Sequence, residues 1–179
     1  MFIIYKLKNI IMKKLSILFF ALVLSITVFG QGKDVVDIAI GSKDHSTLVA
    51  AVKAADLVAT LKSAGPFTVF APTNAAFDKL PEGTVANLLK PENKAQLAKI
   101  LTYHVVSGNL DAAAVMDAIK NGNGKAVLTT VSGGKLTASL DTGKVRLTDE
   151  SGNSALVTVA DLKGTNGVVH VINGVLLPK

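Results

Sequence analysis

Cysteine and tryptophan are absent from this 179-residue sequence, and aromatic residues make up only 5% of it. Without cysteine the chain can form no disulfide bond, thiolate metal site or thiol nucleophile, and it lacks the thiol that a lipid-anchored leader needs. The fold must therefore depend on a hydrophobic core. No basic stripe with interleaved aromatic residues is present, so nucleic acid is not an expected partner.

Histidine is also scarce, with only His45, His104 and His170. This leaves little material for a metal site, and none is predicted. His104 lies at an expected helix-to-strand junction and His170 within a strand, so both are interpreted as hydrogen-bonded structural residues. His45 lies in the run "KDHS". Side chains adjacent in sequence do not normally form a catalytic triad, and we expect His45 to cap a loop.

Two further motifs that could carry chemistry have simpler explanations. "SGGK" at residues 132–135 has the serine–lysine spacing of penicillin-recognising enzymes. Those enzymes place the serine at a helix start, whereas here two glycines between strand-like flanks indicate a hairpin. Each of the four Gly-Lys pairs lacks a following serine or threonine, so no phosphate-binding loop is expected. The sequence predicts no catalytic residue, no cofactor and no enzyme.

The amino-terminal segment has the pattern of an export signal. From Met12, a possible true start, two lysines precede an apolar run from Leu15 to Phe29, and the small residue Gly30 ends a cleavage-site pattern. We expect residues 1–30 to be a signal peptide and residues 31–179 to form a single domain, with no stable membrane span after cleavage. The formal charge of the whole chain is +6. Residues 1–30 contain four lysines and no acid, so about +2 remains on the mature chain.

The apolar spacing changes from a helical to a strand-like period along the mature chain. Up to about Lys120 the spacing is mainly helical, with Ser46 as a plausible N-cap and a short strand at Phe67–Phe70 that Thr73 or Asn74 turns into a helix. From Lys125 onward six strand-like runs, the last at 175–178, are divided by turns rich in Gly, Asn and Asp. Helices followed by hairpins predict an α+β fold with antiparallel strands.

Three blocks of the sequence together resemble the fasciclin domain family. They are "GPFTVFAPTNAAFDKL" at 65–80, "LTYHVVSGNL" at 101–110 and "TNGVVHVINGVLLP" at 165–178, in the family's order and near its spacings. The resemblance covers Val35 to Pro178. It implies a wedge of two antiparallel β-sheets with several α-helices packed at one end. It also implies a generally non-catalytic module of cell adhesion or extracellular matrix.

The same resemblance implies two short recognition features. A Tyr-His pair with apolar neighbours matches Tyr103 and His104, and an acid followed by an aliphatic residue matches Asp161 and Leu162. Leu162 stands where the family has isoleucine. A structural explanation also exists for both pairs: Tyr103 and His104 would fix a helix end on the sheet, and Asp161 would cap the loop before Gly164.

Two functions remain open at this point. The first is a secreted module that binds a cell-surface or matrix protein or polysaccharide by surface complementarity, outside the cell or in the periplasm or envelope. The second is a periplasmic or envelope protein that binds a small ligand or polysaccharide in a cleft. After the leader Tyr103 is the single tyrosine, which weakens a carbohydrate interpretation. The sequence identifies neither the partner nor the oligomeric state.

Overall fold

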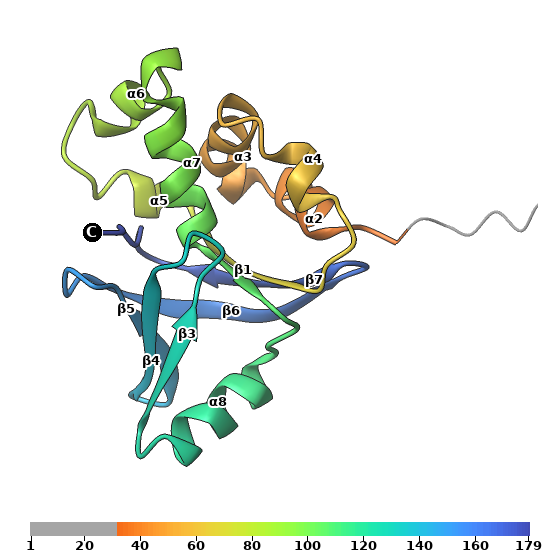
Figure 1. The fold of residues 1–179 in the computed structure, drawn as a ribbon, viewed down its shortest axis with the longest axis vertical. Coiled ribbons are helices and arrows are strands. Elements are labelled where there is room, and N and C mark those ends of the chain that lie inside the picture. Colours follow the sequence, from red (N-terminus) through yellow and green to blue (C-terminus); the bar gives the residue numbers. More distant parts are fainter. Residues whose placement is uncertain (1–31) are drawn as a thin grey trace, which may run out of the picture. The chain divides into compact units, whose positions relative to one another are not determined.

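The computed structural model describes residues 32–179, so the predicted signal peptide at residues 1–30 lies outside the described residues. Residues Gly32–Lys179 form one compact unit. In Figure 1, helices α2 to α7 gather on one side of strands β1 and β7, while helix α8 lies on the other side. Within this part of the chain, no helix combines the length and apolar character that crossing a membrane requires.

The helices are short, and several begin at a polar capping residue. Asp34 accepts hydrogen bonds from the amides of Val36 and Asp37, and both carboxylates pair with Lys62 Nζ at 2.7 Å. Such caps satisfy amides that have no partner within the helix. The helical elements are α2 (Val35–Ile40), η1 (Lys43–His45), α3 (Ser46–Ala54), α4 (Val58–Leu61), α5 (Asn74–Phe77), α6 (Thr84–Leu88), η2 (Pro91–Asn93), α7 (Lys94–Tyr103) and α8 (Ala112–Asn121).

The strands form one seven-stranded sheet in the order β2-β1-β7-β6-β5-β4-β3. A bridge between Val106 and Thr130 brings its two edges together, so the sheet is a nearly closed barrel. The strands are β1 (Phe67–Pro72), β2 (Val105–Ser107), β3 (Lys125–Thr129), β4 (Lys135–Asp141), β5 (Lys144–Thr148), β6 (Ser154–Gly164) and β7 (Gly167–Ile172).

The α+β class is confirmed, but the expected pair of antiparallel sheets is wrong. β1 pairs with β7 in parallel, and the sheet is therefore mixed. The eleven-residue β6 is long enough to pair with β5 at its start and with β7 along the rest, which joins the two expected sheets into one. Sequence periodicity indicates strands but not their partners, because pairing is decided by contacts distant in sequence.

The polar corner after β1 has the expected role. The Thr73 side chain accepts a hydrogen bond from the Ala76 amide and caps α5. Asn74 reaches across to the start of α3, where its Oδ1 accepts from the Thr47 amide and its Nδ2 donates to the Ser46 hydroxyl. The corner therefore connects β1 to two helices. Ser46 was expected to be an N-cap, which is wrong, because it is the first residue of α3 and its hydroxyl bonds to Asn74 instead.

The segment after β7 also differs from the expectation. Residues 175–178 were predicted to be a strand, but they have no regular secondary structure. Side chains satisfy their backbone instead: the amide of Leu176 donates to His104 Nε2 and the amide of Leu177 donates to Asp149 Oδ2. Because these acceptors come from side chains, strand pairing is not required at this end of the chain.

β1 separates two hydrophobic clusters. Phe70 belongs to the cluster inside the barrel, whereas Val69 and Ala71 pack with the cluster beneath the helices. Alternate residues of a strand point to opposite faces, so one strand contributes to both cores. The neighbouring β7 does the same, with Ile172 inside the barrel and Val169 beneath the helices.

Gly167 is required where β7 begins alongside β1. A Cβ at this position would overlap the carbonyl oxygen of Phe67, and backbone cannot move aside as a flexible side chain can. We expect Gly167→Ala to lower the free energy of unfolding by at least about 1–3 kcal/mol. Urea denaturation measures the change. Gly41→Ala is the matched control, since the φ of Gly41 is −71° and suits any residue. Its Cβ would lie 3.3 Å from the Asp37 carbonyl oxygen, which is a close contact without overlap. Equal losses in the two variants would contradict the prediction.

Candidate functional site

Tyr103 lies at the end of α7 and is fully buried, at 0% exposure. Its hydroxyl donates to the Lys135 carbonyl at 2.7 Å and accepts from the Glu150 amide at 3.3 Å. Burial raises the pKa of Tyr103, so the ring stays a neutral phenol. These bonds attach the end of α7 to the start of β4 and to the turn after β5.

His104, the next residue, is 3% exposed and uses both of its ring nitrogens. Nδ1 lies 2.8 Å from the Ile100 carbonyl, and Nε2 accepts from the Leu176 amide at 3.1 Å. These partners require a neutral ring with its proton on Nδ1. Burial lowers the pKa of His104, although the Ile100 carbonyl and the Asp149 carboxylate oppose the shift. His104 therefore fastens the carboxyl-terminal segment to α7.

Asp161 lies in a bulge of β6. Val159 pairs with Val171 and Leu162 with Val169, so two residues, Ala160 and Asp161, face His170 alone. Asp161 has a φ of 61°, which aspartate tolerates better than most residues. The backbone amide of Asp161 faces the ring of His170 and donates a hydrogen bond to its Nδ1 at 3.3 Å.

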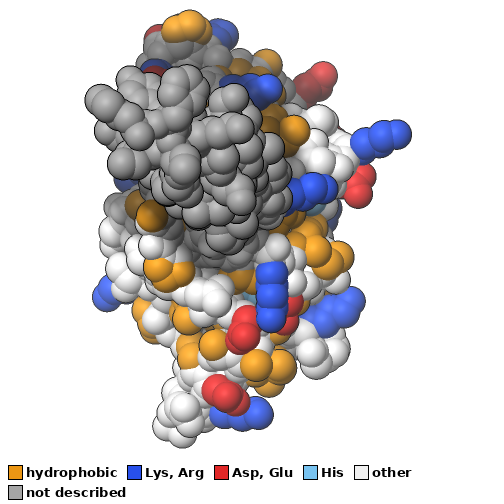
Figure 2. All heavy atoms as spheres, turned by 90° about the vertical axis from the view of Figure 1, so that its right-hand side faces the viewer, with side chains coloured by type: hydrophobic (Ala, Val, Ile, Leu, Met, Phe, Trp, Pro, Cys, Tyr) orange, Lys and Arg blue, Asp and Glu red, His pale blue; other side chains and the backbone are white. Residues whose placement is uncertain are grey.

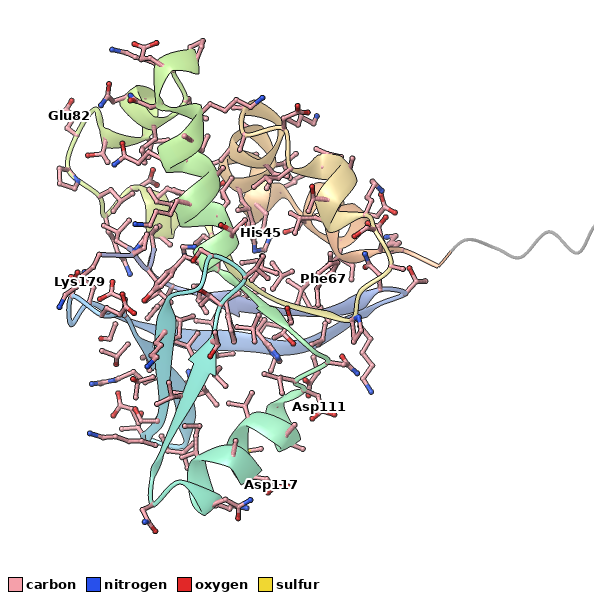
Figure 3. The ribbon with its side chains drawn as sticks, in the orientation of Figure 1. His45, Phe67, Glu82, Asp111, Asp117 and Lys179 are labelled. Carbon is pink, nitrogen blue, oxygen red and sulfur yellow. The ribbon has the colours of Figure 1, made fainter. Side chains whose placement is uncertain are left out.

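The Asp161 side chain is exposed and contacts the start of α8. Its Oδ1 accepts from the Ala112 amide at 2.8 Å, and Asp111, the N-cap, accepts from Ala114 at the same distance. Figure 3 shows Asp111 at this end of α8. A carboxylate is stabilised by the free amides of a helix start. Asp161 therefore links the bulge to α8, rather than capping the loop before Gly164.

Leu162 is half-buried and lines a recess that we call the bulge pocket, with a volume of about 200 Å³. Its polar lining consists of Ser42, Asp44 and His45. Its apolar lining comes from α2, β1, β6 and β7: Ile38, Ala39, Ala71, Val159, Leu162, Val169 and Val171. The pocket thus lies where the helices meet the bulged part of the sheet.

His45 does not act as the expected loop cap. It is 5% exposed, and Figure 3 shows it between the helices and the sheet. Nδ1 lies 2.9 Å from the Ser42 hydroxyl, but Nε2 has no hydrogen-bond partner among the described residues. Burial lowers the pKa of His45, opposed by Asp44 and by the backbone of Ala71. A buried polar atom without a partner costs about 1–3 kcal/mol.

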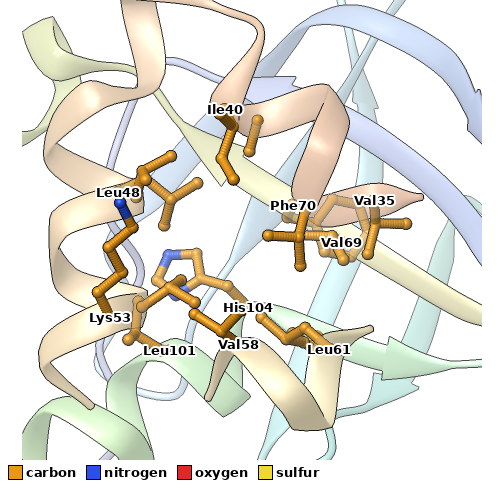
Figure 4. A pocket seen from close by; sticks show the side chains of 15 residues that line it. Val35, Ile40, Leu48, Lys53, Val58, Leu61, Val69, Phe70, Leu101 and His104 are labelled. Carbon is orange, nitrogen blue, oxygen red and sulfur yellow. The ribbon is translucent and has the colours of Figure 1, made fainter. Parts of the chain in front are cut away.

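A second recess lies beneath helices α2, α3 and α4 (Figure 4). It has a volume of about 60 Å³, and its walls are almost entirely aliphatic, among them Val35, Leu48 and Val58. His104 borders it, but both of its nitrogens are already bonded inside the protein. A space of this size is far below the roughly 300–1,000 Å³ of common ligand pockets. It offers little for recognising a ligand.

The structure does not unite the two predicted pairs in one site. Tyr103 and His104 bond to β4, the turn after β5, α7 and the carboxyl-terminal segment, whereas Asp161 and Leu162 lie at the β6 bulge. Among residues 32–179, no group of three or more His, Asp or Glu side chains is arranged to hold a metal ion. The bulge pocket itself was not predicted, because no sequence signal relates His45 to a bulge more than a hundred residues later.

The buried histidines predict how stability depends on pH. In the unfolded chain a histidine has its ordinary pKa near 6.5, whereas burial lowers the pKa of His45 and His104 in the folded chain. The unfolded chain therefore takes up protons first as the pH falls. The free energy of unfolding should be at its highest above about pH 7 and fall below about pH 6.5, by up to about 1.4 kcal/mol per pH unit for each histidine.

Urea denaturation between pH 8 and pH 5 measures this dependence. His104→Leu should be less stable at pH 8, because the Leu176 amide and the Ile100 carbonyl lose their partner, yet its stability should change less with pH. His45→Phe gives a second comparison should the leucine variant fail to fold. Slopes equal to that of the unaltered chain in both variants would contradict the assignment.

Comparison with known proteins agrees with this architecture. The fasciclin domain model matches residues 43–178. Protein sll1483 of Synechocystis sp. is 51% identical over 144 residues, covering 80% of this chain and 73% of the relative. Immunogenic protein MPT70 of Mycobacterium tuberculosis is 35% identical over 158 residues, covering 85% of this chain and 73% of the relative.

A solved structure shares the fold. It is a FAS1 domain pair from the insect cell adhesion molecule fasciclin I, with a TM-score of 0.57 and 23% identity, covering 70% of this chain and 42% of that one. At this identity the likeness concerns the fold alone. The match of the family model to most of the chain, together with the two bacterial relatives, shows that the protein belongs to the fasciclin domain family.

Proposed function

We propose that the chain is exported and acts as a non-catalytic interaction module, which contacts a cell-surface or matrix protein through the surface at the β6 bulge. The observation that carries the proposal is the exposed carboxylate of Asp161 beside half-buried Leu162, at the position of a recognition feature of the family. The leader pattern of residues 1–30 supports a location outside the cell or in the periplasm or envelope.

The surroundings of Asp161 suit a protein contact. Val159, two residues away on β6, is 48% exposed, and the exposed Ile40 ends α2, which packs against β6. In Figure 2 the visible hydrophobic side chains lie in small groups among charged ones. A few apolar anchors inside a polar rim are typical of interfaces between separately folded proteins. Such a small contact gains strength when several copies bind together.

In this proposal Tyr103 and His104 have a positioning role. Both are buried and hold α7 against the barrel and the carboxyl-terminal segment. A partner at the surface would reach neither ring. Loss of either side chain would therefore act on binding through the stability of the fold.

A protein partner is better supported than a polysaccharide. Sugar sites commonly use an exposed aromatic ring, but none of the aromatic side chains in residues 32–179 is exposed: Phe67 is half-buried, and Phe70, Phe77 and Tyr103 are buried. A second candidate function, the binding of a small ligand, is supported by a specific observation. This is the bulge pocket, a recess of about 200 Å³ with mostly apolar walls and with Ser42, Asp44 and His45 in its lining.

Asp161→Asn tests the proposed contact with little effect on the fold. Asparagine also tolerates a positive φ, and its side-chain oxygen can still accept from the Ala112 amide, so mainly the charge is removed. We expect binding to a captured surface or matrix protein to weaken roughly two- to fivefold, since a charge at an interface rim contributes little. Pull-down from exported and envelope proteins, followed by titration of the captured partner, measures it.

Asp117→Asn is the matched control, because this α8 carboxylate is 70% exposed and takes no part in the bulge. It should bind like the unaltered chain. Equal binding by both variants would show that the contact surface lies elsewhere. If the unaltered chain retains no macromolecule, the interaction function itself is contradicted.

A further inference from the structure

We propose that residues 174–179 form a latch on the barrel, which is released when His104 takes up a proton while the sheet and the helices stay folded. This inference does not rest on the proposed protein contact. It depends on how the segment is attached, on the hydrogen bonds of the His104 ring, and on the charged groups around that ring.

The latch is attached to the rest of the chain by side chains. Within residues 32–179, no backbone-to-backbone hydrogen bond involves residues 174–179, which lie beyond the end of β7. Its side-chain partners are His104 Nε2, 3.1 Å from the Leu176 amide, Asp149 Oδ2, 3.0 Å from the Leu177 amide, and the exposed Lys99 Nζ, 2.8 Å from the Lys179 oxygen. A segment without ladder hydrogen bonds opens locally at a lower free energy than a strand inside a sheet.

Burial of one side chain adds to these bonds. Leu176 is 0% exposed and belongs to the hydrophobic cluster inside the barrel. Asn173, just before the latch, is held to β6 by two hydrogen bonds with the backbone of Leu156. Gly174 follows, and a glycine adopts more backbone conformations than any other residue, so it provides the hinge. Release would therefore move residues 174–179 alone and expose Leu176 together with the apolar surface that it covers.

His104 holds the latch only while its ring is neutral. Its Nδ1 carries the proton toward the Ile100 carbonyl, so the lone pair of Nε2 accepts from the Leu176 amide. A second proton would occupy that lone pair and leave two N–H groups facing each other. Burial lowers the pKa of His104 in the closed structure. Once the latch leaves, Nε2 loses its partner and the pKa returns toward the ordinary histidine value near 6.5.

Two charged groups face the ring. The Asp149 carboxylate favours the protonated ring, although burial outweighs it in the closed structure. Lys53 of α3 borders the same recess beneath the helices as His104 and disfavours a second positive charge there (Figure 4). Proton uptake is thus easier in the released state, which no longer buries Nε2 under the latch. The closed latch is therefore most stable above about pH 7 and loses stability as the pH falls below about 6.5.

Amide hydrogen exchange of the purified chain, followed by NMR, tests the latch. Protection factors are used because they remove the intrinsic effect of pH on exchange. Between pH 6.5 and pH 5.5 we expect the protection of the Leu176 and Leu177 amides to fall by up to about tenfold. The Val168 amide, inside the sheet, should stay more strongly protected at each pH. Equal protection of all three amides at every pH, or no fall at Leu176, would overturn the proposal.

Three variants assign the effect to His104. His104→Gln brings a carbonyl oxygen to the Leu176 amide but cannot take up a proton, so protection should change less than about twofold over this range. His45→Phe removes the other histidine whose pKa burial lowers, and it should keep the full fall. Leu176→Ala should lower the protection of the Leu177 amide at every pH with the same pH dependence.

The variants and the unaltered chain give separate tests. The full fall in His104→Gln, its loss in His45→Phe, or unchanged protection in Leu176→Ala would overturn the inference. Should His104→Gln fail to fold, the comparison of Leu176 with Val168 in the unaltered chain still decides, because it asks whether the latch opens without the sheet.

Discussion

The parallel contact between β1 and β7 is the interaction on which the rest of the structure depends. These strands run side by side over six residue pairs, from Phe67 and Gly167 to Pro72 and Ile172. Their alternate side chains enter both hydrophobic clusters, so the helical layer and the barrel share one wall. Because Gly167 has no Cβ, the backbone of β7 can approach the Phe67 carbonyl closely enough to form that wall.

Buried polar side chains in this wall and next to it connect distant segments of the chain by hydrogen bonds. The buried Thr68 hydroxyl donates to the Gly108 carbonyl and accepts from the Leu110 amide, and His170 Nε2 lies 2.8 Å from the Leu110 carbonyl. Asp149 holds the turn after β5 and the Leu177 amide. Each group connects segments distant in sequence with its hydrogen bonds satisfied. His45 differs from them because its Nε2 makes no hydrogen bond of normal geometry within residues 32–179.

Local signals in the sequence predicted the local structure well. The turns around Gly133, Gly143 and Gly152 lie where expected, each with a positive φ at the glycine, and Thr73 caps the helix after β1. The expectation that His104 and His170 are hydrogen-bonded is confirmed, and both are buried. In these cases the chemistry of one or two residues decides the conformation.

The sequence could not predict features that depend on distant segments. The parallel β1–β7 pair, the closure at Val106 and Thr130, and the bulge opposite His170 all require residues far apart in the chain. The same limit applies to the candidate site. Asp161 and Leu162 were identified by resemblance, but the burial of His45 beside them follows only from how α2 and η1 pack on the sheet.

The pairing of β1 with β7 also bears on the order in which the chain acquires its structure. Phe67 and Gly167 are partners about 100 residues apart, so the sheet cannot close until nearly the whole polypeptide is available. A nascent chain would therefore lack the wall shared by the barrel and the helical layer until its last strands were present.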